Sequence, residues 1–109
     1  MMGIKVTIER FAENSQPGWV ECRLIDAAGA HHLFEEKVPV VTVDVLDAQS
    51  EYPREGIIGC TLVHSRVTDN GRELVTVNTE LPWGIESKSG QVQFEILRQQ
   101  VVEFSNQAG

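Results

Sequence analysis

The sequence lacks long hydrophobic runs, and it is poor in cysteine, in aromatic residues and in basic residues. Its 109 residues include two Cys, four Phe, two Trp, one Tyr and nine Lys or Arg. A membrane helix needs about 20 predominantly apolar residues. The N-terminal segment 1–5 contains no apolar stretch long enough for a signal peptide or a membrane span. We therefore expect no membrane as a partner.

The two cysteines, Cys22 and Cys60, both lie inside apolar segments. Their number allows one disulfide. The favoured interpretation is instead a pair of buried thiols that act as small hydrophobic side chains. Because the sequence shows no signal peptide, we expect the protein in the reducing cytoplasm.

The shortage of basic residues also limits the classes of partner. Nine Lys and Arg stand against 16 Asp and Glu, which gives a net charge of −7. Proteins that bind nucleic acid or anionic membranes present a basic face, and no basic cluster is visible in the sequence. We expect no nucleic acid as a partner.

The remaining composition is that of one folded domain. Hydrophobic residues make up 41% of the chain and charged residues 23%, which is typical of globular proteins. A chain of this length can bury a core without disulfides or metals. The sequence predicts a single β domain over residues 1–109.

Alternation of apolar and polar residues predicts most of the strands. The expected strands are 4–11, 19–26, 31–38, 56–68, 72–80 and 91–97, and 40–46 is β-like by composition. A competing helical spacing joins Phe94, Leu97, Val101 and Phe104, so we expect a short C-terminal helix or a frayed tail after residue 98. The apolar corner 81–85 contains Trp83, for which a place in the core is favoured.

About six short strands predict a mainly β fold, either a small antiparallel barrel of the OB-like or SH3-like kind or a strongly bent sheet. A two-layer sandwich is the alternative. The residues 69–71, Asp-Asn-Gly, give the strongest hairpin signal.

Two registers are possible for this hairpin. A two-residue loop pairs Val67 with Leu74, whereas a three-residue loop with Gly71 in the left-handed conformation pairs Ser65 with Val75 and Val63 with Val77. A slip of one residue exchanges the two faces of a strand. The second register is favoured because it separates apolar from polar side chains. Its apolar face comprises Ile57, Val63, Val67, Val75 and Val77.

No residue set has the spacing of a catalytic or metal site. His31 and His32 precede Glu35 and Glu36, but residues four apart on a strand are separated by roughly 13 Å. Structural metal sites usually need more Cys or His at defined spacing, so we expect no metal and no cofactor. The sequence contains no nucleophile elbow, phosphate loop, Rossmann glycine pattern or HExxH motif. We expect no catalytic residue, and the chain is interpreted as a binding protein rather than an enzyme.

Two surfaces are candidates for binding. Residues 35–55 hold six acidic and two basic residues, a net charge of −4, and the polar part from 47 to 55 predicts an exposed loop or a short helical turn. The candidate partner-binding residues are Asp44, Asp47, Glu51, Tyr52 and Glu55. The alternative ligand face is the polar side of the 56–80 hairpin, with His64, Arg66, Thr76 and Asn78.

Four segments of the chain resemble a group of small bacterial proteins of unknown activity. These segments are 37–41, 52–53, 56–60 and 78–87, and the resemblance spans roughly residues 18–104. It implies a bacterial cytoplasmic protein and transfers no functional residue.

Three functions remain open at this point. The first is a non-catalytic acidic module, of the immunity or adaptor type, that binds a basic protein. The second is a small ligand-binding barrel or enzyme that uses the face around His64. The third is a homo-oligomer subunit of structural role, joined through an exposed strand edge or the segment 94–104.

Overall fold

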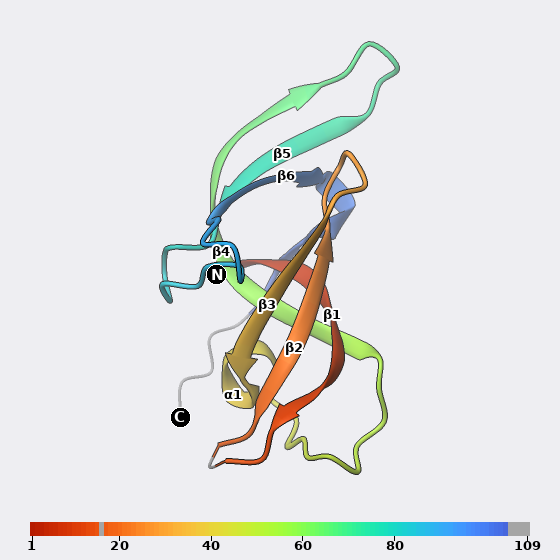
Figure 1. Cartoon of the computed structure of the whole chain (residues 1–109). Coiled ribbons are helices and arrows are strands. Elements are labelled where there is room, and N and C mark those ends of the chain that lie inside the picture. Colours follow the sequence, from red (N-terminus) through yellow and green to blue (C-terminus); the bar gives the residue numbers. More distant parts are fainter. Residues whose placement is uncertain (16, 105–109) are drawn as a thin grey trace.

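The structure, a computed structural model, describes residues 1–15 and 17–104 as one strongly curled antiparallel sheet with almost no helix (Figure 1). This confirms the expected mainly β fold, in the form of a half-barrel. The strands of the described residues are β1 (Met2–Glu13), β2 (Trp19–Ile25), β3 (His31–Lys37), β4 (Arg54–Val67), β5 (Glu73–Asn78), β6 (Gln93–Leu97) and β7 (Val101–Glu103). Their order is β3-β2-β1-β4-β5-β6, and β7 pairs with β1.

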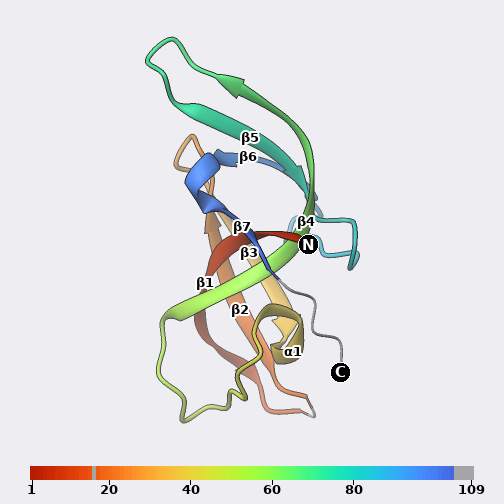
Figure 2. The ribbon, with the colours of Figure 1, turned by 180° about the vertical axis from the view of Figure 1, so that it is seen from behind.

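The long strand β4 joins the two parts of the sheet. Its first half pairs with β1, from Arg54 opposite Ile8 to Cys60 opposite Met2. Its second half pairs with β5 instead, from Thr61 opposite Asn78 to Val67 opposite Glu73. Because the partner changes along one continuous strand, the sheet bends around β4, and the β4–β5 hairpin continues outward as a projecting arm (Figures 1 and 2).

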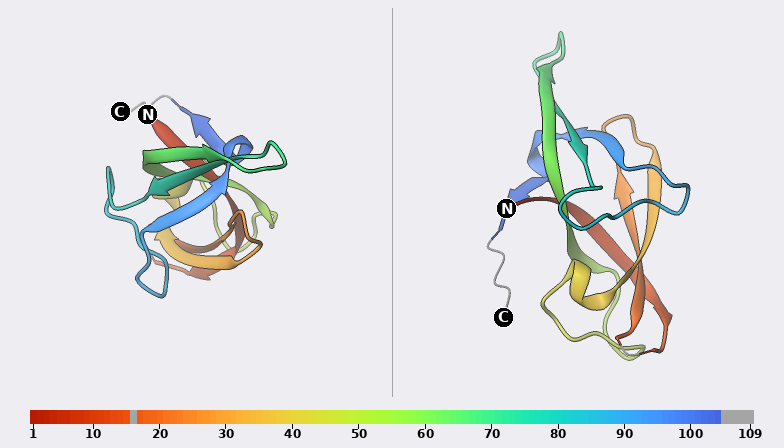
Figure 3. Two further views of the ribbon diagram at one scale, coloured as in Figure 1. Left: turned by 90° about the horizontal axis from the view of Figure 1, so that it is seen from above. Right: turned by 90° about the vertical axis from the view of Figure 1, so that its left-hand side faces the viewer.

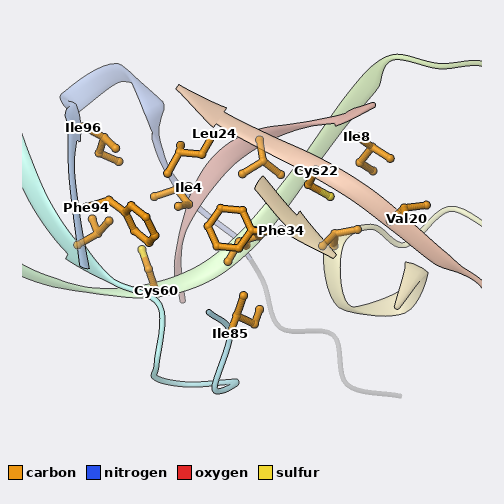
Figure 4. Packing of buried hydrophobic residues seen from close by; sticks show 14 of the residues in the cluster. Ile4, Ile8, Val20, Cys22, Leu24, Phe34, Cys60, Ile85, Phe94 and Ile96 are labelled. Atoms are coloured by element: carbon orange, nitrogen blue, oxygen red, sulfur yellow. The ribbon is translucent and has the colours of Figure 1, made fainter. Parts of the chain in front are cut away.

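The core fills the concave side of the curled sheet (Figure 4). Phe34 of β3 is fully buried, and its ring lies 5.6 Å from that of Phe94 on β6. The alternation in β2 buries Val20, Cys22 and Leu24, as their spacing predicts. Further buried members include Ile4, Ile8, Ile58, Val75, Val77, Ile85 and Ile96.

Both cysteines are free and buried in this core. The sequence-based preference for two thiols over a disulfide is therefore confirmed. Burial, together with the smaller effect of the negative charges on Glu36, Glu21 and Glu9, raises the pKa of the Cys22 thiol to about 12. Burial likewise raises the pKa of Cys60 to about 11.

The predicted strand 40–46 is wrong. The chain forms a single helical turn there, α1 (Val38–Val41), and then a loop. Pro39 fits the first turn of a helix, because backbone N–H groups at that position have no hydrogen-bond partner within the helix and proline lacks one. Val38 and Val41, three residues apart, fall on one side of this turn and are both buried. Burial of that side overrides the β propensity of the valines.

The strand predicted up to about residue 98 is present as β6, but neither a continuing helix nor a frayed tail follows it up to residue 104. A 3-10 turn, η1 (Arg98–Gln100), is followed by β7, in which Val101 is buried opposite Ile4. The Gln100 side chain accepts a hydrogen bond from the N–H of Leu97 and donates one to the carbonyl of Ile25, each at 2.8 Å. These two hydrogen bonds hold η1 beside the end of β2, immediately before the chain enters β7. The predicted tail beyond residue 104 lies outside the described residues. The described part of the chain has no helix with the length and apolar character that a membrane crossing requires.

The arm confirms the predicted register near its tip but not at its base. Ser65 lies opposite Val75, and Gly71 has the left-handed φ of +84°. Nearer the core, Leu62 rather than Val63 lies opposite Val77, because Val63 is an extra residue in a β-bulge. The valines expected on one apolar face are also split. Val75 and Val77 are buried, whereas Val63 and Val67 are exposed because the arm extends past the core (Figure 3).

Trp83 lies on the rim of the molecule rather than in the core, contrary to the preference from sequence. Its side chain is 38% exposed. The ring covers Gly59, where a Cβ atom would come within 2.9 Å of it, and tilts against the ring of Phe104 at 5.9 Å. Ile85 is the buried residue of this corner.

Candidate functional site

The acidic loop, residues 42–53, connects α1 to β4 at the end of the molecule opposite the arm (Figure 1). Short-range hydrogen bonds hold its turns. The Asp47 carboxylate accepts a hydrogen bond from the N–H of Gln49 at 2.8 Å, and the Asp47 N–H donates one to the Ser50 hydroxyl at 3.0 Å. The Tyr52 hydroxyl donates to the Asp47 carbonyl at 2.8 Å. The loop therefore has a defined shape without belonging to the sheet.

The structure distributes the five predicted partner-binding residues over two places. Asp44, Asp47 and Glu51 are exposed in the acidic loop, and the Asp44 carboxylate accepts a hydrogen bond from Arg54 at 2.7 Å. Tyr52 is partly buried and packs against the core, so it anchors the loop. Glu55 is exposed on β4, opposite Thr7 of β1, and belongs to the outer face of the sheet.

Sequence reasoning missed two residues of this surface. Val43 is 99% exposed and Val45 is 96% exposed, on either side of Asp44. Leu46, the next residue, is buried and fixes this part of the loop to the core. The alternation Val-Asp-Val was the available signal, but the segment 40–46 was interpreted as β-like by composition and its valines were not considered as surface residues.

A groove of about 610 Å³ lies between the acidic loop and the β1–β2 turn. Its lining is mixed: it includes the polar side chains of Asn14, Ser15 and Thr42, and Asp44 and Asp47 lie at the loop side. The apolar lining residues include Phe11, Val38, Pro39, Val43, Val45 and Leu46. Such a groove, with apolar side chains and carboxylates in its lining, suits an apolar side chain that is followed or preceded by a basic one.

A second, smaller cavity of about 300 Å³ lies on the outer face of the sheet, and Lys5, Arg23, Arg54 and Glu55 contribute to its lining. Two of these cations already have partners in the chain. Arg23 donates to Glu9 at 2.7 Å, and Arg54 donates to Asp44. The cavity thus has mixed charge, and two of its four charged side chains are already paired within the chain.

On the alternative ligand face, His64 lies opposite Thr76, and Arg66 lies two residues further along β4, opposite Leu74. The bulge at Val63 places Asn78 opposite Thr61. Arg66 donates two hydrogen bonds to the Glu95 carboxylate, at 2.8 and 2.9 Å. This pairing lowers the pKa of Glu95 and raises that of Arg66. Thr76 is buried, His64 is exposed, and neither of the two cavities is lined by them.

The histidines of β3 have separate partners. His32 lies 2.8 Å from the Asp26 carboxylate, and His31 lies 2.7 Å from Arg23. Burial raises the pKa of Asp26, but hydrogen bonds from His32 and from the N–H groups of Ala28 and Ala30 outweigh it and leave that pKa lowered. Within residues 1–15 and 17–104 there is no group of three His, Cys, Asp or Glu positioned to hold a metal ion.

Comparison of the chain with protein families, with curated proteins and with solved structures finds no match.

Proposed function

We propose that this protein is a non-catalytic binding module that docks a basic protein partner on its acidic loop. The observation that carries the proposal is the almost complete exposure of Val43 and Val45 on either side of Asp44. A single exposed apolar residue is ordinary, but two almost fully exposed valines that line the same groove as Pro39 and Leu46 form an apolar patch. Such patches are typical of protein contacts.

The energetics of this surface favour association. Burying one valine side chain gains about 1.5–3 kcal/mol. Because the folded chain leaves Val43 and Val45 exposed to water, a partner that covers them can gain this free energy on binding. Tyr52 and Leu46 already hold the loop, which reduces the entropy lost when a partner orders it.

The charge of the surface selects the partner. The segment 35–55 carries a net charge of −4, and Asp47 and Glu51 have no cationic partner among the described ion pairs of the chain. Carboxylates at the edge of an apolar contact speed the association of basic partners and reject acidic ones. By analogy of size and charge alone, this is the arrangement of an immunity-type inhibitor or an adaptor.

We also propose that the protein resides in a reducing cytoplasm. The free thiols of Cys22 and Cys60 support this compartment.

The test uses the full chain, immobilised and exposed to a lysate at about 0.05 M salt and then washed at about 0.5 M salt, because screening weakens exposed charge pairs. We expect capture of a basic protein that elutes at the higher salt. Capture should fail with the double variants D44N/D47N and V43S/V45S. The matched controls E86Q and V63S change an exposed acid and an exposed valine away from the acidic loop, and they should bind as the unmodified chain does. Equal capture by loop variants and controls would remove the proposal.

A further inference from the structure

The outer half of β4 is an open sheet edge. Pairing with β1 ends where Cys60 lies opposite Met2, and the residues 61–67 pair only with β5, on their other side. The described strands provide no neighbour for this edge, and Figure 1 shows β4 as the outermost strand of the arm. An unpaired edge presents a row of N–H and C=O groups to solvent.

The hairpin geometry identifies which backbone groups face outward. The Thr68 N–H donates to the Arg72 carbonyl at 2.8 Å, so Thr68 points its backbone groups toward β5. In an antiparallel ladder this orientation alternates from residue to residue. The N–H and C=O of Val67 and Ser65 therefore point to the open edge, and those of Arg66 point inward.

This edge carries few of the features that normally protect one. Lys, inward-pointing charges, Pro and bulges discourage pairing between edges. Residues 61–67 contain no acidic residue, no Lys and no Pro, and their one Arg, Arg66, is paired with Glu95 on β6. The bulge at Val63 affects the base of the arm only, and the ladder from His64 to Val67 is regular. Leu62, Val63 and Val67 are about half exposed or more.

We propose that a second copy of this chain pairs with the edge, so that two arms form one antiparallel ladder. Two identical edges related by a two-fold axis meet antiparallel, and each presents Ser65 and Val67 to the other. The charge of the chain favours this location. Residues 61–73 contain two Arg, one Asp and one Glu, a net charge of zero, whereas the whole chain carries −7. Two copies therefore repel each other least at their arms.

Pairing through the arms leaves the acidic loops free. The molecule is elongated, with extents of 46 × 29 × 24 Å, and the loop and the arm lie at opposite ends (Figures 1 and 3). The proposal stands independently of the proposed function, because it uses the backbone edge of residues 61–67 and none of the residues of the acidic loop.

The experiment measures the mass of the full chain by sedimentation from about 1 µM to about 1 mM, a range that spans moderate and weak dimers. We expect a concentration-dependent dimer and slower hydrogen exchange at the Ser65 and Val67 amides as the dimer forms. The S65P variant removes one outward N–H per copy and should weaken dimerisation about tenfold or more. S65A retains that N–H and should dimerise as the unmodified chain does.

A second variant, V67K, covers the case in which S65P fails to fold, because a lysine on the edge blocks pairing without changing the backbone. A monomer throughout the concentration range would overturn the proposal. So would a dimer that S65P and V67K leave intact, or open-ended assemblies that grow without stopping at two chains.

Discussion

Two valines of the arm, Val75 and Val67, provide a matched test of where the core ends. They lie on neighbouring strands of the same hairpin, and the sequence pattern places them on one apolar face. In the structure Val75 is 2% exposed and Val67 is 67% exposed. We predict that V75A destabilises the protein several times more than V67A.

The magnitude follows from the area removed from water. Valine to alanine deletes two methyl groups, each worth about 0.8 kcal/mol when buried, so V75A loses about 1.6 kcal/mol of transfer free energy. The cavity left behind raises the total to about 2–3 kcal/mol. For Val67, about a third of the side chain is covered, so the same bookkeeping gives about 0.5 kcal/mol. Both substitutions lower β propensity equally, and this contribution cancels in the comparison.

The assay is urea unfolding followed by tryptophan fluorescence, at a protein concentration low enough to exclude association. Equal slopes with denaturant allow the midpoints to be compared as free energies. If V67A costs as much as V75A, the arm is packed against something in the isolated chain and the described exposure is wrong.

Three further outcomes follow from buried or paired groups. The pKa of Asp26 is lowered in the folded state. Its contribution to stability is therefore present above the unfolded pKa of about 3.9 and is lost as pH falls through the folded pKa. Between about pH 5 and about pH 2, the urea midpoint of D26N should fall less than that of the unmodified chain. Thr79 is fully buried and donates to the Ile85 carbonyl at 2.7 Å, so T79V should cost about 1–2 kcal/mol in urea unfolding, whereas T61V at an exposed position should cost less than about 0.5 kcal/mol. The two buried thiols, with raised pKa values, should react with a thiol reagent at about pH 8 only when urea unfolds the chain, and rapid labelling in native buffer would contradict their burial.

The strands could be predicted wherever one face of the strand is buried and the other is exposed to solvent. In β2 the alternation of Val20, Cys22 and Leu24 with Glu21 and Arg23 gives both the strand and its inward face. The same logic gives the turn at the tip of the arm, because Gly71 is suited to the left-handed conformation there. These features are local, so a single sequence contains them.

The errors arise where a local preference meets a distant contact. Val38 and Val41 favour strands by composition, yet one helical turn buries both against the core. Val101 fits a helical spacing, yet it pairs with Ile4, which is 97 residues away. Val67 belongs to an apolar face by pattern, but a pattern shows which side chains share a face and not how far the sheet extends past its core.

The candidate site was only partly visible for the same reason. Charge density alone singled out Asp44 and Asp47, because formal charge is read from the sequence without a structure. Val43 and Val45 were missed because the segment 40–46 was interpreted as β-like by composition and its valines were not considered as surface residues. Tyr52 was found, but its role is to hold the loop through the Asp47 carbonyl.

The two proposed contacts differ in physical origin, and ionic strength separates them. Contacts made by Asp44 and Asp47 are exposed and charged, and the Debye length falls to about 3 Å at 1 M salt. The arm edge is held by backbone hydrogen bonds and by Val67 in a segment of zero net charge. Added salt also screens the repulsion between two chains of charge −7. Rising salt should therefore release a basic partner while it strengthens the dimer, and a single mechanism acting at both ends cannot produce these opposite responses.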